Sequence, residues 1–439
     1  MQTPNVKMGS LALVLLAMAV YGGNLRVQAQ TLTTIYSFTG ANGDGEYPFP
    51  EGQMVFDSNG ALYGTTASGG TNYNGTVFQL VPPKQPGGAW TENVLYRFAG
   101  GADGRQPSTS VVFDQAGNLY GATQFGGNLQ VCGGGCGTIF ELSPPSQPGG
   151  QWTHTVLWTF QGSFDGQYPG EVLFGSNGSL FATTSSGGTP GVLCHTNQRI
   201  KFGCGTVFEL TPPAKKGGAW TKTVLYTFPG FKGDGTGPGT EITFDSQGNI
   251  YGVTGGGTSG YGTVFQLSPP SGGGSWKETV LHDFTGGSDG GNPGGTVTVG
   301  PNGVLYGVGS YSGVANASGV AFQLTQSGGV WSETVLYTFP GFKGDATTPS
   351  TTLAIDPSGN LYGTSDFGGS NACNLGCGTI FKLAPPSGSH GWTESVLFEL
   401  GNSGQNPNSS LVEFHNGLLY GNTTYLGASD VGSVFTLVP

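Results

Sequence analysis

The fold of this chain is decided by a stretch that reads Val112-Phe-Asp-Gln-Ala-Gly-Asn-Leu-Tyr-Gly121, then Gly137-Thr-Ile-Phe-Glu-Leu142, then Trp152-Thr-His-Thr-Val-Leu-Trp-Thr-Phe160. It holds four short runs rich in β-branched and aromatic residues. Gly, Pro, Asn and Asp separate these runs, so the pattern predicts four β-strands joined by tight turns. Similar stretches recur along the whole chain, and an internal repeat of this kind sets the architecture.

The copies align on the last aromatic residue of the fourth run. These anchors are Phe38, Phe98, Phe160, Phe228, Phe284, Phe339 and, in degraded form, Leu400. Their spacings are 60, 62, 68, 56, 55 and 61 residues, so seven units fill residues 30–439 as one domain. The units end near residues 98, 160, 228, 284, 339, 400 and 439. Four antiparallel strands repeated seven times predict an all-β protein, a seven-bladed β-propeller.

The two ends of the repeat predict how the ring closes. The last unit stops at Val431-Gly-Ser-Val-Phe-Thr-Leu437, which is a third run with no fourth run after it. The first unit is preceded by Thr31-Leu-Thr-Thr-Ile-Tyr-Ser-Phe38, which is a fourth run alone. We therefore expect the N-terminal strand to complete the last blade. An open solenoid would need polar capping repeats, and none is visible. A two-sheet sandwich is the alternative architecture.

The composition excludes several classes of protein. Glycine makes up 84 of 439 residues, which argues against a helical protein because each helical glycine costs about 1 kcal/mol relative to alanine. Aromatic residues make up 12% and charged residues only 9%, the opposite of a disordered chain. The glycines show no three-residue period, so collagen is excluded.

The N-terminus predicts export from the cytoplasm. Lys7 precedes an apolar run, Leu11–Val20, and Val27-Gln28-Ala29 resembles a cleavage site, so we interpret residues 1–29 as a signal peptide. An uncleaved membrane anchor is the alternative. No other stretch is long and apolar enough to span a bilayer. The expected location is extracellular or periplasmic.

The charge argues against nucleic acid as a partner. The formal net charge is −11, and removal of Lys7 and Arg26 with the signal leaves 12 basic and 25 acidic residues. An acidic surface repels phosphate backbones.

The chain from Gln30 onward resembles the GloVer tandem-repeat proteins of bacteria, which are secreted repeat proteins. The matching strings are G-N-L-Y-G-T, G-T-V-F-x-L and W-T-x-x-V-L-Y-x-F, as in Gly117 to Ala122, Gly205 to Leu210 and Trp220 to Phe228. The resemblance implies a propeller outside the cytoplasm and implies no established activity. The first two strands of each unit also look like NHL and kelch blades, which is a fold-level analogy only.

Six cysteines lie in three local pairs: Cys132 and Cys136, Cys194 and Cys204, Cys373 and Cys377. Six cysteines allow fifteen connectivities, but the repeat favours the local pairing. In an exported protein we expect three disulfides that clip the loops between the second and third strands. A metal site is the alternative, although no Cys/His set has the spacing of a zinc site.

A carboxylate recurs where one unit passes to the next, usually in an Asp-Gly pair. The residues are Asp44, Asp103, Asp165, Asp234, Asp289 and Asp345, and Ser403 stands in the last copy. Such a ring of carboxylates is a candidate binding face for Ca²⁺ or a polyol. The alternative interpretation is that the Asp-Gly pair is a turn, which recurs because the fold repeats. The long loop of the third unit adds His195, Arg199 and Lys201, a candidate contact for an anion. We expect these loops to share one face, together with loop aromatics such as Tyr73, Phe125 and Tyr311.

Motifs for catalysis are scarce. The five histidines fall at non-equivalent repeat positions, and no nucleophile elbow, phosphate loop or dinucleotide fingerprint is present. The glutamates of the fourth strand, Glu92, Glu278, Glu333 and Glu394, are interpreted as exposed strand positions. We identify no catalytic, cofactor-binding or metal-ligating residue and expect no cofactor.

The preferred function is that of a secreted binding module for glycans or cell-surface proteins. Loop aromatics and a polar, weakly charged surface favour this function. One alternative is a propeller-type polysaccharide lyase or hydrolase, which needs a unit that breaks the repeat with a catalytic residue near the axis. The other is a structural or adhesive surface protein.

Overall fold

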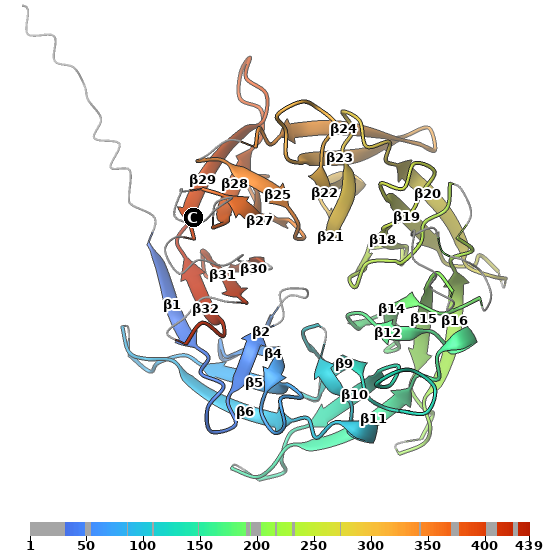
Figure 1. Cartoon of the computed structure of the whole chain (residues 1–439), viewed down its shortest axis with the longest axis vertical. Helices are drawn as coiled ribbons and strands as arrows, with labels where there is room; N and C mark the ends of the chain where they lie inside the picture. Colours follow the sequence, from blue (N-terminus) through green and yellow to red (C-terminus); the bar gives the residue numbers. More distant parts are fainter. Residues whose placement is uncertain are drawn as a thin grey trace, which may run out of the picture.

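The computed structural model describes residues 31–439 apart from 49–53, 86, 108, 148, 190–193, 195–202, 216, 231–232, 273, 342–343, 370–376, 401–410 and 425–428. Its strands form seven antiparallel sheets, arranged as blades around a central axis (Figure 1). The fold is a seven-bladed β-propeller, as the repeat predicted. The helical segments of the described residues are three 3₁₀ turns: η1 (Gly101–Asp103), η2 (Ser163–Asp165) and η3 (Pro301–Gly303).

Each blade runs from an inner strand at the axis to an outer strand at the rim. Blade 1 holds β2 (Gly45–Pro48), β3 (Val55–Phe56), β4 (Leu62–Gly69), β5 (Thr76–Val81) and β6 (Thr91–Arg97). Blade 2 holds β7 (Arg105–Pro107), β8 (Val112–Phe113), β9 (Leu119–Phe125), β10 (Thr138–Ser143) and β11 (Thr153–Thr159). Blade 3 holds β12 (Gln167–Pro169), β13 (Leu173–Phe174), β14 (Leu180–Ser186), β15 (Thr206–Thr211) and β16 (Thr221–Thr227).

The remaining blades follow the same order. Blade 4 holds β17 (Thr243–Phe244), β18 (Ile250–Thr254), β19 (Thr263–Ser268) and β20 (Lys277–Asp283). Blade 5 holds β21 (Gly291–Val299), β22 (Leu305–Tyr311), β23 (Val320–Ser327) and β24 (Val330–Thr338). Blade 6 holds β25 (Ala346–Pro349), β26 (Ala354–Ile355), β27 (Leu361–Gly368), β28 (Thr379–Ala384) and β29 (Thr393–Glu399). Blade 7 holds β30 (Leu411–His415), β31 (Leu418–Thr423), β32 (Ser433–Leu437) and, as its outer strand, β1 (Leu32–Ser37).

The ring closes where the sequence predicted. β1 pairs antiparallel with β32, and the register places Leu32 opposite Leu437 and Ser37 opposite Ser433. Figure 1 shows the first strand lying beside the last strands of the chain. The N-terminal strand is therefore the fourth strand of blade 7, and both ends of the propeller are held by one ladder of backbone hydrogen bonds.

The anchor phenylalanines of the repeat connect neighbouring blades. Each ends an outer strand and packs on the phenylalanine of the third strand in the next blade. Ring centroids lie 5.1 Å apart for Phe38 and Phe78 and 5.0 Å apart for Phe339 and Phe381. The other pairs are Phe98–Phe140, Phe160–Phe208, Phe228–Phe265 and Phe284–Phe322. All these rings are fully buried, and such edge-on pairs add about 0.5–1.5 kcal/mol each beyond the burial of their area.

The glycine that opens the third strand leaves room for the next blade. Gly137 has a φ of 97°, and a Cβ atom there would lie 2.5 Å from the Cδ atom of Pro169 in the inner strand of blade 3. Gly75 stands in the same relation to Pro107 of blade 2. Only a residue without a side chain fits between the two blades. The recurring Gly-Thr and the recurring inner-strand Pro are thus two sides of one contact.

The residue before that proline forms a backbone hydrogen bond to the preceding blade. Tyr47, Gln106, Tyr168, Asn292 and Thr348 all have a φ between 50° and 58°. The turned backbone directs each N–H away from its own sheet. Tyr168 N–H, for example, donates to Cys136 O of blade 2 at 3.0 Å. In blades 1, 2, 3 and 6 the inner strand consists of two short pieces, and the first piece ends at that proline.

We predict that Phe228→Ala will lower the free energy of unfolding by about 3–5 kcal/mol, because the change removes a fully buried ring and leaves a cavity between blades 3 and 4. Chemical denaturation monitored by tryptophan fluorescence measures the loss. Val330→Ala is the control, since this side chain is 69% exposed, and it should change the value by less than about 0.5 kcal/mol. Equal effects of the two variants would contradict the role assigned to the ring pair.

Candidate functional site

The connections between strands lie on two opposite faces of the ring. The connections from blade to blade and from second to third strand lie on one face, which we call the loop face. The turns from first to second and from third to fourth strand lie on the other, which we call the turn face. This arrangement follows from four antiparallel strands per blade. The loop face carries the Asp residues predicted as a binding face.

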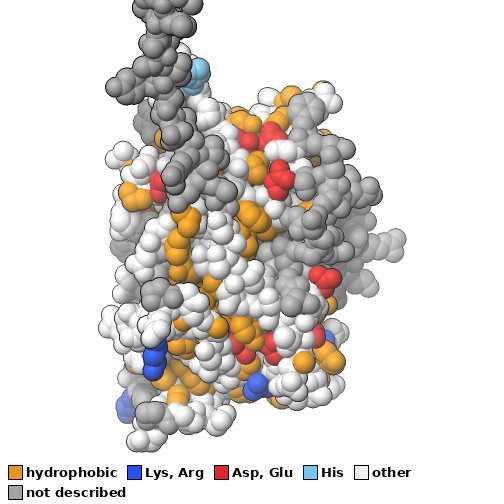
Figure 2. Space-filling model, turned by 90° about the vertical axis from the view of Figure 1, so that its left-hand side faces the viewer, with side chains coloured by type: hydrophobic (Ala, Val, Ile, Leu, Met, Phe, Trp, Pro, Cys, Tyr) orange, Lys and Arg blue, Asp and Glu red, His pale blue; other side chains and the backbone are white. Residues whose placement is uncertain are grey.

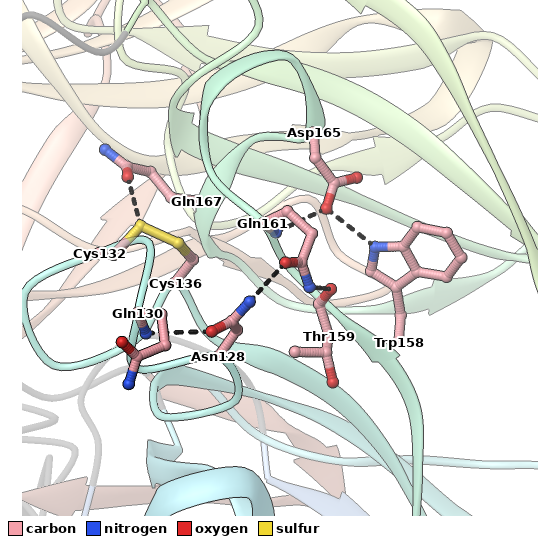
Figure 3. Close-up of a disulfide and its surroundings, with 9 residues drawn as sticks. All are labelled: Asn128, Gln130, Cys132, Cys136, Trp158, Thr159, Gln161, Asp165 and Gln167. Atoms are coloured by element: carbon pink, nitrogen blue, oxygen red, sulfur yellow. Dashed lines mark hydrogen bonds between the residues drawn. A yellow bond between two sulfur atoms is a disulfide. The ribbon is translucent and has the colours of Figure 1, made fainter.

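Each of these Asp carboxylates is used in contacts within the protein. It accepts hydrogen bonds from its own loop and from the outer strand of the blade before it. Asp103, for example, accepts the Ala99 N–H at 2.6 Å and the Tyr96 hydroxyl at 2.6 Å. Asp165 accepts the Gln161 N–H at 2.8 Å and the Trp158 indole N–H at 3.3 Å (Figure 3).

A third side chain from the outer strand of the following blade completes each group. We call the resulting sets the inter-blade triads. Their members are Tyr36–Asp44–Glu92, Tyr96–Asp103–His154, Trp158–Asp165–Lys222, Tyr226–Asp234–Glu278, His282–Asp289–Glu333 and Tyr337–Asp345–Glu394. Lys222 Nζ lies 3.0 Å from Asp165 Oδ1, and His154 Nδ1 lies 3.1 Å from Asp103 Oδ1. The triads therefore join neighbouring blades in pairs.

The seventh interface shows that the triad changes as a unit. At the aromatic position blade 6 has Phe398, and at the third position blade 7 has Leu32, and both pack into one apolar cluster. Ser403, at the Asp position, lies outside the described residues. Two polar partners are thus absent where the Asp is absent. This pattern supports the turn and packing interpretation of the Asp-Gly repeat, while a ligand-binding role of these Asp residues stays a prediction.

The fourth-strand glutamates are half-buried, and the expectation that they are exposed was wrong. Each glutamate lies against the Asp of its own triad, so two carboxyl groups share one inter-blade contact. Burial first, and the neighbouring Asp second, raise the pKa of Glu92, Glu278 and Glu333 to about 7. The same causes raise the pKa of Glu394 to about 8. Burial lowers the pKa of His154, and the nearby Asp103 carboxylate opposes this lowering.

Two of the expected disulfides are confirmed, Cys132–Cys136 and Cys194–Cys204. Cys377 is also disulfide-bonded, and its expected partner Cys373 lies outside the described residues. The same holds for His195, Arg199 and Lys201, so the predicted anion contact is not located. Phe125 packs on Tyr168 with a centroid distance of 5.3 Å, whereas Tyr73 is 69% exposed.

The first disulfide braces a second loop, the one before blade 3 that carries the predicted binding-face residue Asp165. A Cβ atom on Gly162, in the loop before blade 3, would lie 3.1 Å from Cys132 Sγ. The amide of Asn128 in the clipped loop donates to Gln161 Oε1 at 2.7 Å, and Gln167 Oε1 lies 3.0 Å from Cys132 Sγ (Figure 3). The clipped loop of blade 2 and the loop before blade 3 are therefore held together.

Phe164 lies at the tip of this braced loop and is 72% exposed. Phe164 belongs to η2, and the contacts of its triad hold Asp165, the last residue of η2, in place. Leu129 and Val131 of the clipped loop are also exposed, and so are the polar residues Gln130, Gln161 and Ser163. We call Phe164, Leu129, Gln130, Val131 and Gln161 the clipped-loop patch. The position before the Asp is Gly43, Ala102, Gly233, Ser288 and Gly344 in other units, so comparison of the copies would have found Phe164.

A cavity of about 630 Å³ lies at the propeller axis. Toward the turn face its wall is formed by inner-strand residues such as Val55, Leu173 and Phe244. Deeper in, Glu171 and Glu241 line it, and both are buried. Sequence reasoning missed these two glutamates, although they break the repeat: the residue before the buried aliphatic of the inner strand is Ser110, Thr296 or Thr352 in other units.

Other features of a site are few in the part of the chain that the structure describes. No group of three or more His, Cys, Asp or Glu side chains gathers there as a metal cluster would. No helix within it has the length and hydropathy needed to cross a bilayer. Figure 2 shows one side of the ring, where charged side chains are sparse among uncharged ones.

Comparison with known proteins identifies the repeat. The Gloeobacter/Verrucomicrobia repeat family matches residues 20–192, 132–372 and 277–439. No curated protein sequence matches the chain.

Solved structures share the fold at low sequence identity. A polysaccharide lyase of family PL25, an ulvan lyase, covers 92% of this chain and 95% of its own, with 10% identity and a TM-score of 0.52. An α-L-arabinanase of Penicillium chrysogenum covers 92% and 97%, with 13% identity and a TM-score of 0.44. The endosialidase of phage phi92 covers 93% and 68%, with 12% identity and a TM-score of 0.43. At 10% identity, the likeness to the lyase shows the propeller fold alone.

The acidic triads predict a pH effect that one substitution isolates. The pKa of Glu394 in the folded protein, about 8, lies above its ordinary value of 4.5. The neutral carboxyl therefore stabilises the fold below pH 4.5, and this contribution is lost as the pH rises through about 8. Glu394→Gln keeps a neutral side chain at every pH. We expect its melting temperature to rise relative to the native protein by a few degrees between pH 5 and pH 9.

Differential scanning calorimetry across this pH range makes the comparison. Glu399→Gln, an exposed position on the same strand, is the matched control and should show no trend with pH. A difference between Glu394→Gln and the native protein that stays constant with pH would rule out the acid pair as its cause.

Proposed function

The chain belongs to the Gloeobacter/Verrucomicrobia repeat family, and we propose that this member binds neutral polysaccharide outside the cytoplasm through its clipped-loop patch. The proposal places residues 1–29 as the export signal. The two confirmed disulfides support the location, because disulfides persist in oxidising compartments.

The observation that carries the proposal is the exposed ring of Phe164. Other units have glycine, alanine or serine at this position, so the fold does not need a large side chain there. A ring that is 72% exposed leaves apolar area in water that burial against a ligand would recover. The flat face of an aromatic ring matches the C–H face of a sugar. Because the loop that carries Phe164 is already braced, binding does not have to order this loop, and the entropic cost of binding is lower.

The surroundings of the ring suit a neutral sugar. Gln130 is exposed and offers a side-chain amide, which donates and accepts hydrogen bonds as sugar hydroxyls do. Asp165 at the base of the loop is already paired with Lys222. A net charge of −11 disfavours sulfated or uronic acid polymers, which the protein would repel.

We predict that Phe164→Ala will lower the binding of the secreted protein to insoluble neutral polysaccharides by about tenfold, since a stacked ring contributes about 0.5–1.5 kcal/mol beyond the burial of its area. Co-sedimentation with cellulose, xylan, mannan and β-glucan measures the binding. The substitution restores the residue that the preceding unit has at Ala102, so the melting temperature should not change.

Val330→Ala is the matched control, because this side chain is equally exposed and lies on the turn face. Equal binding by both variants, or no binding of the native protein to any polymer, would reject the proposal. Soluble sugar released in the same tubes would favour the lyase or hydrolase. Binding to cell-envelope material after removal of its glycans would favour a structural or adhesive role.

A further inference from the structure

Tyr73 lies in the loop between β4 and β5 of blade 1, and its backbone adopts an unfavourable conformation. Its φ is 57°, and the residue before it, Asn72, has a φ of 59°. In this left-handed region the Cβ atom of a residue other than glycine comes too close to the backbone, and asparagine tolerates the region better than an aromatic residue does. In the corresponding loops of the other blades, the described residues with a positive φ are all Gly, Asn or Asp. Blade 1 therefore holds a bulky aromatic residue where the fold otherwise uses small or polar ones.

The side chain of Tyr73 does not repay this strain by packing in the fold. It is 69% exposed, and within the described part of the chain its ring packs on no other aromatic ring and its hydroxyl forms no hydrogen bond. Tyr47 and Tyr168 also have a positive φ, but their backbone N–H groups donate to the preceding blade. Strained residues cluster at sites that contact a ligand. An exposed aromatic ring suits such a contact, because its apolar area would be buried on binding.

The loop that carries Tyr73 is held at its base by blade 2. The carbonyl oxygen of the next residue, Asn74, accepts the Gln106 N–H at 2.8 Å. A Cβ atom on Gly100, in the loop before blade 2, would lie 2.9 Å from Asn74 Nδ2, so this loop packs closely on the loop of blade 1. Because these contacts fix the loop, binding would not have to order it.

A continuous series of loop contacts connects Tyr73 with the clipped-loop patch. The loop of Tyr73 contacts the loop before blade 2. That loop in turn contacts the clipped loop of blade 2, where the Gly127 N–H donates to Gly101 O at 2.7 Å. The clipped loop contacts the loop of Phe164 through the hydrogen bond at Gln161. The two exposed rings therefore lie on the loop face of one surface, which adjacent loops of blades 1 to 3 form together.

This surface suits a neutral polymer. The clipped-loop patch contains no charged side chain. Asp103 and Asp165, in the two loops that flank it, are bonded within their triads. The guanidinium of Arg105 lies over the ring of Phe125, 5.2 Å from its centroid. A sugar chain on this surface would contact mainly aromatic rings, aliphatic side chains and amides, which interact with its C–H faces and hydroxyls.

We propose that Tyr73 is a second sugar-stacking residue, and that a neutral polysaccharide lies along the loop face of blades 1 to 3, from Tyr73 to Phe164. This inference rests on the proposed function and deepens it, because it assigns the form of the ligand: an extended segment of a polymer rather than a single sugar. Two rings that contact one chain act as linked sites. Binding at one ring raises the effective concentration of the chain at the other.

The binding of oligosaccharides of increasing length tests the second ring. Isothermal titration of the secreted protein uses cello-, xylo-, manno- and laminari-oligosaccharides, from the disaccharide to the octasaccharide. We expect the affinity of the native protein for one of these series to rise by about tenfold or more with length. Tyr73→Gly should lose this rise but keep the affinity for the shortest ligands, which Phe164 binds alone. Its melting temperature should rise by about one degree, because glycine adopts a positive φ without strain.

Asn72→Gly is the matched control, because it changes the neighbouring residue of the same turn and keeps the ring. Its affinity should increase with ligand length as that of the native protein does. Tyr73→Phe also keeps the ring and should bind like the native protein.

The outcomes separate this inference from the proposed function. If affinity does not depend on length, or if Tyr73→Gly shows the same length dependence as the native protein, the second ring is rejected while binding at Phe164 stands. A lower melting temperature of Tyr73→Gly would also reject it, since the ring would then serve the fold. If the native protein binds none of the oligosaccharides or polymers, the proposed function is rejected, and this inference with it.

Discussion

Contact between an aromatic ring at the end of each outer strand and a ring in the next blade is the interaction on which the rest of the structure depends. A single four-stranded sheet cannot bury both of its faces, so each blade is stable only against its neighbours. Phe228 and Phe265 form one such contact, and five equivalent phenylalanine pairs lie at five other interfaces. Leu400, the exception, is buried with Phe435 in the last interface, so the ring closes with a smaller side chain.

The fold could be predicted because the repeat carries it in local patterns. The sequence shows the strand runs, the turn residues and the unpaired fourth strand at the N-terminus. Each of these predicts one element of a blade, and each blade packs against blades built in the same way. Glu92 shows where this reasoning fails. Alternation along a strand predicts an exposed residue, but the side chain meets Asp44 across a blade interface, a contact that depends on how two sheets pack. Periodicity within one strand says nothing of the facing sheet.

The candidate sites were hidden for a different reason. Phe164, Glu171 and Glu241 are departures from the repeat, whereas reading by consensus gives weight to what the copies share. In a repeat protein the shared residues build the scaffold, and the positions that differ among copies are free to serve a ligand. The triad Asp residues illustrate the converse. They recur in six units, and the structure uses them to join blades.

The pairing of β1 with β32 also constrains how the protein can be made. The strand that leaves the ribosome first has its partner among the last residues of the chain, Ser433–Leu437. Blades 1 to 6 can assemble in order of synthesis, while β1 keeps an open edge until the C-terminus arrives. The entropic cost of closing so long a loop grows with the logarithm of its length, by about 0.6 kcal/mol for each doubling. Completion of the ring is therefore a late event, and a chain cut short before β32 leaves its earliest strand unpaired.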